Sequence, residues 1–116
     1  MSLSDLKVGF LGAGNMTQAI AGGMISSDTV PPGNITASAR SEKGLETVKS
    51  MGIVASLDNR EVVKSCSVIF LAVKPHILPG VLKEIADCVT DQHLLVSVVN
   101  MTTNKEIEEL VGMFIL

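Results

Sequence analysis

Two glycines near the start of the chain lie where an apolar run gives way to a helical pattern. Lys7–Leu11 (KVGFL) is followed by Gly12-Ala13-Gly14, and from about Asn15 apolar residues recur near helical spacing. A first glycine permits a tight turn, and a second lets the backbone approach a phosphate without an intervening Cβ. The positive end of the next helix would face that phosphate. The pattern predicts a dinucleotide site, and a purely structural turn is the alternative.

The third position of this G-x-G-x-x-G fingerprint is occupied by Thr17 instead of glycine. The third glycine of the fingerprint serves close packing between helix and strand. We therefore expect the first helix and the first strand to pack slightly further apart.

The end of the second expected strand bears on which dinucleotide binds. An NAD site has an acid there that accepts hydrogen bonds from the ribose hydroxyls. Here the stretch reads Ser38-Ala39-Arg40-Ser41, with Glu42 as the nearest acid. Arg40 can pair with a 2′-phosphate while the serine hydroxyls donate to it. NADP(H) is therefore favoured, with NAD(H) possible, and a solvated turn arginine is the alternative.

A second candidate segment, Ala72-Val73-Lys74-Pro75, lies at the mouth of the fourth expected strand. Its place at the carboxyl edge of a parallel sheet suits a nicotinamide ribose. Pro75 favours an extended Lys74. We assign no proton transfer to Lys74, and His76 is interpreted as a surface histidine. The sequence shows no paired carboxylates, Ser/His/Asp set or metal cluster, so the catalytic residues stay unknown and no metal is expected.

These candidate residues require a particular order of elements to position them. The expected strands are Lys7–Leu11, Ile35–Ala39, Ile53–Ala55, Ser67–Val73 and His93–Val98. The first expected helix starts at about Asn15, the second runs from a Ser41 cap to about Met51, and the third runs from an Asp58 or Asn59 cap to about Ser65. The fourth follows a turn bracketed by Pro75 and Pro79 and ends near Cys88, and the fifth covers Thr103–Leu110. This alternation predicts a Rossmann-like, doubly wound α/β domain, with a mainly parallel sheet and helices on both faces.

Composition excludes several other classes. The 116 residues suit one domain, and 47% are hydrophobic with neither Trp nor Tyr. The net charge of −3 and the scattered basic residues argue against nucleic-acid binding. Apolar runs such as Val68–Val73 are too short to span a bilayer, and the N-terminus lacks a signal-peptide pattern, so we expect a cytoplasmic protein. Cys66 and Cys88 are expected to be small buried hydrophobic residues.

Four segments together carry a family resemblance. They are GFLGAGNM (Gly9–Met16), Asn59-Arg60-Glu61-Val62, FLAVKPH (Phe70–His76) and LVSV (Leu95–Val98). Over about residues 6–98 the chain resembles pyrroline-5-carboxylate reductase. The resemblance implies an NAD(P)H-dependent reductase of the last step of proline synthesis, in which hydride passes to the carbon of a cyclic imine.

The resemblance also implies the parts of a cofactor site. Leu11–Met16 would hold the pyrophosphate, Ser38–Ser41 the adenosine phosphate, Asn59 the adenine ribose, and Ala72–Pro75 the nicotinamide side. The candidate cofactor-binding residues are Leu11, Gly12, Ala13, Gly14, Asn15, Met16, Ser38, Arg40, Ser41, Asn59, Ala72, Val73, Lys74 and Pro75.

Two departures from the family pattern shape the functional expectation. Where the family continues Ala-Ala-Gly-Val, this chain has Val99-Asn100-Met101-Thr102, so Met101 replaces a glycine. The family's helical C-terminal domain, which dimerises and supplies most of the substrate pocket, is expected to be absent from residues 1–116. We therefore expect weak or no turnover. The apolar end, Met113–Leu116, indicates a cut, a splice junction or a surface for a partner or oligomer.

Two other functions stay open. One is a non-enzymatic NADP(H)-binding module that senses redox state or regulates a partner, which the altered Asn100-Met101 turn favours slightly. The other is a different reductase with the same glycine loop, such as a hydroxyacid dehydrogenase-like enzyme, against which the AVKP segment (Ala72–Pro75) argues.

Overall fold

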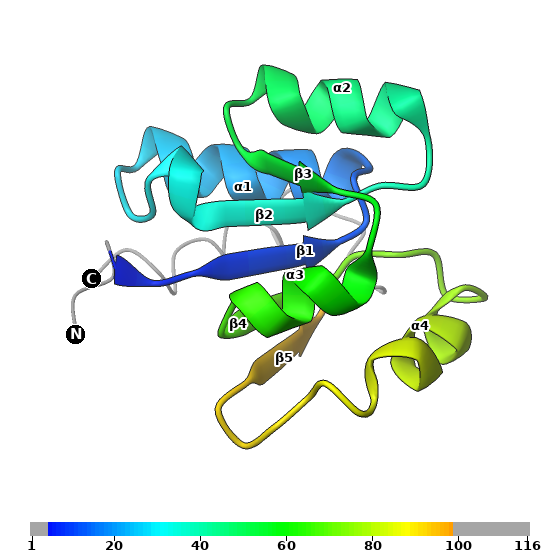
Figure 1. Cartoon of the computed structure of the whole chain (residues 1–116). Coiled ribbons are helices and arrows are strands. Elements are labelled where there is room, and N and C mark those ends of the chain that lie inside the picture. Colours follow the sequence, from blue (N-terminus) through cyan, green and yellow to red (C-terminus); the bar gives the residue numbers. More distant parts are fainter. Residues whose placement is uncertain (1–4, 99–116) are drawn as a thin grey trace.

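The computed structural model describes residues 5–98, which form one sheet with helices on both sides (Figure 1). The strands are β1 (Val8–Leu11), β2 (Ile35–Ser38), β3 (Val54–Ser56), β4 (Val68–Leu71) and β5 (Leu94–Ser97). The helices are α1 (Asn15–Ser26), α2 (Glu42–Ser50), α3 (Asn59–Ser65) and α4 (Leu78–Ile85), with a short 3-10 turn, η2 (Pro32–Asn34). Among these described residues, no helix is long and apolar enough to cross a membrane.

The sheet is parallel throughout and has the strand order β3-β2-β1-β4-β5. The chain therefore reverses its direction of winding between β1 and β4, and ligands of such sheets bind at that switch point, beyond the carboxyl ends of the strands. The register aligns Leu11 at the end of β1 with Ser38 of β2 and Leu71 of β4. The residues after these three strands consequently meet at one edge of the sheet.

Alternating side chains of the central strands build a core on each face. Phe10 and Phe70 point into the cluster under α1 and α2, where their rings stack with centroids 4.9 Å apart. Their neighbours Leu11 and Leu71 point into the second cluster, under α3 and α4. Each strand of this kind is buried on both faces, which is why it reads as a continuous apolar run. The predicted Rossmann-like, doubly wound fold is confirmed.

Local signals explain where two of the helices begin. The Ser41 hydroxyl accepts a hydrogen bond from the Gly44 amide at the start of α2, and the Asp58 carboxylate accepts one from the Arg60 amide at the start of α3. At the end of α2, Gly52 adopts a φ of +81°, as expected of a glycine that closes a helix.

The α4 helix differs from the sequence-based prediction at both ends. Pro79 lies in its first turn and not in the loop before it, because a missing N–H costs nothing at that position. The helix ends at Ile85 and not near Cys88, because the Ile85 carbonyl accepts from the amides of both Cys88 and Val89 and closes a tight turn. The expected strand ends were also one or two residues too long at β1, β2, β4 and β5, where the ladders have four paired positions.

The two cysteines are free thiols and both are buried, as predicted. The predictions for Asn100-Met101, Thr103–Leu110 and Met113–Leu116 lie outside the described residues.

Candidate dinucleotide-binding site

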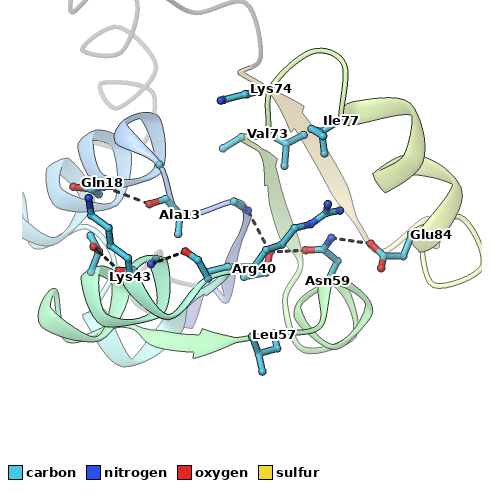
Figure 2. Close-up of a pocket in the computed structure, with 18 of the residues that line it drawn as sticks. Ala13, Gln18, Arg40, Lys43, Leu57, Asn59, Val73, Lys74, Ile77 and Glu84 are labelled. Atoms are coloured by element: carbon cyan, nitrogen blue, oxygen red, sulfur yellow. Dashed lines mark hydrogen bonds between the residues drawn. The ribbon is translucent and has the colours of Figure 1, made fainter.

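A cleft of about 650 Å³ opens at the carboxyl edge of the sheet, at the switch point between β1 and β4 (Figure 2). Its volume is in the range of small-molecule and cofactor pockets, about 300–1,000 Å³. The lining residues are Gly12, Ala13, Gly14, Gln18, Ser38, Ala39, Arg40, Ser41, Lys43, Gly44, Thr47, Leu57, Asn59, Ala72, Val73, Lys74, His76, Ile77 and Glu84.

The two glycines of the turn after β1 play different parts. Gly12 has a φ of +115°, and a Cβ there would lie 2.5 Å from the Ala72 carbonyl oxygen, so only glycine fits between β1 and the end of β4. Gly14 has an ordinary φ of −80°, and a Cβ there would have nothing within 4 Å. The space beside Gly14 belongs to the cleft, and this leaves the backbone free to approach a ligand, as predicted from the fingerprint.

Helix α1 begins at the cleft without a cap. Gly14 is its N-cap residue and offers no side-chain hydrogen bond, and the first turn contains no acidic residue. By contrast, α2 and α3 each have a capping side chain and an acid in the first turn. The first amides of a helix lack partners within the helix and carry its positive end. The uncapped start of α1 therefore suits an anion in the cleft.

Thr17 stabilises the turn from within. Its side chain is fully buried, and its hydroxyl donates a 2.7 Å hydrogen bond to the Gly12 carbonyl. The residue that replaces the third glycine thus ties the first turn of α1 to the glycine turn. The expected wider spacing between helix and strand stays a prediction.

Basic side chains lie on the β2–α2 side of the cleft. Arg40 follows β2, and in Figure 2 its side chain extends across the cleft in the direction of Asn59. Lys43, in the first turn of α2, adds a second cation that the sequence-based prediction missed. The signal was available, because Lys43 is three residues beyond Arg40 on a helix with a recognised cap. The two cations suit a phosphate group on this side.

A chain of hydrogen bonds crosses the floor of the cleft. The Gly12 amide donates to the Ser38 hydroxyl at 3.2 Å, and that hydroxyl donates to the Asn59 carboxamide oxygen. The Asn59 amide nitrogen in turn donates to the Glu84 carboxylate at 2.7 Å (Figure 2). Ser38 and Asn59 were predicted from sequence, whereas Glu84, from α4, was not. The network fixes the orientation of the Asn59 side chain.

The segment after β4 forms the opposite wall. Ala72, Val73 and Lys74 line the cleft, and the Lys74 carbonyl accepts hydrogen bonds from the amides of Ile77 and Leu78 at the start of α4. His76 and Ile77 also line it, so the turn into α4 contributes more of the wall than the sequence indicated.

Four of the predicted residues do not line the cleft. Leu11 is fully buried in the core under α3 and α4, and Met16 packs against the core under α1. Asn15 and Pro75 are exposed beside the cleft. The lining residues that were not among the predicted set are Gln18, Ala39, Lys43, Gly44, Thr47, Leu57, His76, Ile77 and Glu84.

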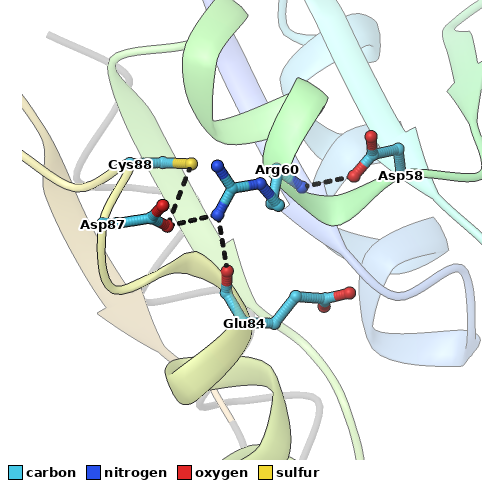
Figure 3. A network of polar contacts seen from close by, with 5 residues as sticks. All are labelled: Asp58, Arg60, Glu84, Asp87 and Cys88. Carbon is cyan, nitrogen blue, oxygen red and sulfur yellow. Dashed lines mark hydrogen bonds and ion pairs between the residues drawn. The ribbon is translucent and has the colours of Figure 1, made fainter.

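A second polar network holds α4 against α3, outside the cleft (Figure 3). The Arg60 guanidinium donates to the Glu84 carbonyl at 3.1 Å and forms an ion pair with Asp87. The hydrogen bond from Arg60 holds the pKa of the Asp87 carboxyl below its usual range, and the same bond raises the pKa of Arg60. At the opposite end of α3, burial raises the pKa of the Cys66 thiol. Among residues 5–98, no group of acids, histidines and cysteines could hold a metal ion.

The strand order, the glycine turn and the uncapped α1 together define a dinucleotide-binding domain of the Rossmann type. Residues 7–101 match the family described as NADP oxidoreductase, coenzyme F420-dependent, and the chain belongs to this family.

Known proteins confirm the resemblance to pyrroline-5-carboxylate reductases. The chain is 48% identical to pyrroline-5-carboxylate reductase 3 of Danio rerio over 106 residues, which cover 91% of this chain and 37% of that protein. The chain thus spans little more than a third of the length of this curated relative.

Solved structures show the same similarity. A pyrroline-5-carboxylate reductase from Coxiella burnetii superimposes with a TM-score of 0.77 and 31% identity, over 92% of this chain and 40% of that chain. A Plasmodium falciparum pyrroline carboxylate reductase with NADP bound gives a TM-score of 0.73 and 28% identity, over 93% of this chain and 38% of that chain.

Proposed function

We propose that this chain binds NADP(H) in the cleft, as the cofactor-binding part of a pyrroline-5-carboxylate reductase-like oxidoreductase. The observation that carries the proposal is the uncapped N-terminus of α1 directly behind Gly14, where a Cβ-free backbone borders the cleft. The first amides of α1 would bind the pyrophosphate, because they combine free donors with the positive end of the helix. The NADP named for the Plasmodium falciparum relative supports this choice of ligand.

The preference for the phosphorylated cofactor rests on the charges after β2. Arg40 and Lys43 both line the cleft there, and β2 ends in Ser38, where an NAD site would have an acid. A guanidinium and an ammonium favour the 2′-phosphate of NADP(H), with Ser41 as a further hydroxyl donor.

The reaction that we propose for the whole protein is reduction of a cyclic imine to L-proline. When bound, NADPH would supply the hydride to the imine carbon. The names of the relatives support this substrate class. We expect residues 1–116 alone to show weak or no turnover, since relatives of this kind are more than twice as long.

Calorimetric titration of the 116-residue chain with NADPH and with NADH tests the proposal. We expect NADPH to bind more tightly than NADH. Arg40→Ala should weaken NADPH binding about ten- to a hundredfold, which corresponds to the free energy of hydrogen bonds to a charged group, and should have little effect on NADH binding. Lys49→Ala is the matched control, because it removes a cation from the far end of α2, outside the cleft. If neither cofactor binds, the proposal is refuted. If NADH binds more tightly than NADPH, the role of Arg40 is refuted.

A non-enzymatic NADP(H)-binding module is the second candidate, favoured by Met101 in the place of a family glycine. It predicts the same cofactor binding. The protein should then fail to oxidise NADPH with pyrroline-5-carboxylate even when it is supplied with the substrate domain of a relative.

A further inference from the structure

One carboxylate stands in a cleft whose other charged side chains are basic. Among the described residues that line it, Arg40, Lys43 and Lys74 are cationic and Glu84 is the single acid. Glu84 comes from α4, and in Figure 2 it lies beside Asn59, on the side of the cleft toward which Arg40 extends and away from Lys43. A negative charge does not help a site to bind phosphates, so the position of Glu84 in the cleft requires another explanation.

Hydrogen bonds connect the Glu84 carboxylate, through Asn59, to the end of β2, where we place the adenosine ribose. It accepts from the Asn59 amide nitrogen at 2.7 Å, while the Asn59 oxygen accepts from the hydroxyl of Ser38 at the end of β2. The end of β2 is where dinucleotide-binding folds place the acid that accepts from the adenosine ribose. The Asn59 carboxamide therefore lies between the end of β2 and the Glu84 carboxylate, and it bonds to both.

The backbone of Glu84 is also held. Arg60 donates to the Glu84 carbonyl and pairs with Asp87, which lies just beyond the end of α4 (Figure 3). Asn59 and Arg60 are adjacent in the first turn of α3, so both ends of Glu84, carbonyl and carboxylate, are bound to the same turn. The carboxylate is thus fixed beside the cleft even though its side chain is exposed.

We infer that Glu84 is a specificity-determining residue that opposes the 2′-phosphate and favours the unphosphorylated adenosine ribose. This inference rests on the proposed function. A fixed carboxylate repels a phosphate dianion and can accept a hydrogen bond from a ribose hydroxyl. Arg40 and Lys43 act in the opposite sense. Glu84 consequently narrows the preference for NADPH over NADH that these two cations create.

The test compares the ratio of the NADH and NADPH dissociation constants in the wild type and in Glu84→Gln. Glutamine keeps the length of the side chain and an oxygen that accepts from Asn59, but it removes the charge. We expect the ratio of the NADH to the NADPH dissociation constant to rise about three- to tenfold, because the substitution removes the repulsion between two partly hydrated negative charges. The rise should shrink at high salt, because screening weakens the repulsion.

Glu61→Gln is the matched control, because Glu61 lies two residues beyond Asn59 on α3 and outside the cleft. The same loss of one negative charge there should leave the ratio unchanged. A ratio in Glu84→Gln equal to that of the wild type would overturn the inference while the proposed function stands. An equal rise in both variants would also overturn it, because the effect would then reflect net charge. If the wild type binds neither cofactor, the proposed function and the inference both fail.

Discussion

Replacing Gly14 with alanine separates the binding role of the glycine turn from its structural role. The φ of −80° at Gly14 suits any residue, and an added Cβ would meet nothing within 4 Å. Alanine is a poorer N-cap residue than glycine, but it also restricts the unfolded chain. Because each effect is worth about 1 kcal/mol or less and the two oppose each other, the free energy of unfolding should change by less than about 1 kcal/mol.

The same methyl group would stand in the cleft at the start of α1, where we place the pyrophosphate. It would hold the phosphate away from one or two backbone amides. Hydrogen bonds to charged groups are worth about 1.5–3 kcal/mol, so NADPH should bind about ten- to a hundredfold more weakly. NADH should lose as much, because the two cofactors share the pyrophosphate.

Gly12→Ala should behave in the opposite manner. Its φ of +115° strains any L-residue, and its Cβ would lie 2.5 Å from the Ala72 carbonyl oxygen. Backbone strain and overpacking each cost about 1–3 kcal/mol, so we expect a loss of about 2–6 kcal/mol in the free energy of unfolding. With an unfolding entropy of about 2.1 cal/mol/K per residue, a chain of 116 residues loses about 4 °C of melting temperature per kcal/mol, so the shift should be plain in a thermal melt.

The assay pairs urea unfolding with calorimetric titration for both variants and for Gly33→Ala. Gly33 lies in η2 outside the cleft, and a Cβ there would also meet nothing within 4 Å, so this control should keep both stability and binding. Wild-type affinity in Gly14→Ala, or equal destabilisation by Gly12→Ala and Gly14→Ala, would refute the reasoning.

Three further predictions concern the core and the titrating groups. Phe70→Ala should reduce the free energy of unfolding by about 3–5 kcal/mol in urea titrations, because Phe70 is fully buried and stacks on Phe10; a loss below about 1 kcal/mol would contradict this packing. The bond from Arg60 lowers the pKa of Asp87, so the stabilisation by this pair should be complete above the unfolded pKa of about 3.9 and disappear as the pH falls through the lower folded value. The difference in stability between wild type and Asp87→Asn should therefore vanish in strong acid, and a difference that persists there would contradict the assignment. Cys66 is buried and its pKa is raised, so at neutral pH its thiol should react with a disulfide reagent only when the protein opens or unfolds. Immediate reaction in native buffer would contradict this burial.

Much of the architecture follows from local signals in the sequence. The strand-to-glycine transition at Gly12, the Ser41 cap and the alternation of apolar runs with helical patterns predict the elements and their parallel arrangement. The positions of Gly12, Ser38 and Asn59 in the cleft then follow, because the carboxyl ends of parallel strands meet at one edge.

The remaining parts of the site depend on contacts between distant residues. Glu84 joins Asn59 across 25 positions, and nothing in the segment around Glu84 indicates that it faces the cleft. Leu57 and Ile77 line the cleft because of the paths of two loops, which periodicity does not define. Leu11 shows the opposite case: it lies beside the glycine turn, but its side chain packs in the core under α3 and α4, and its predicted contact with the cofactor stays a prediction.

The most direct test of the central claim is an amide ¹H–¹⁵N NMR titration of the 116-residue chain with NADPH. If the start of α1 binds the pyrophosphate and the β2–α2 side binds the adenosine phosphate, the largest shifts should fall on the amides of Ala13–Thr17 and Arg40–Gly44. Shifts concentrated on β5 and the turns far from the cleft, or no shifts at saturating NADPH, would contradict the account.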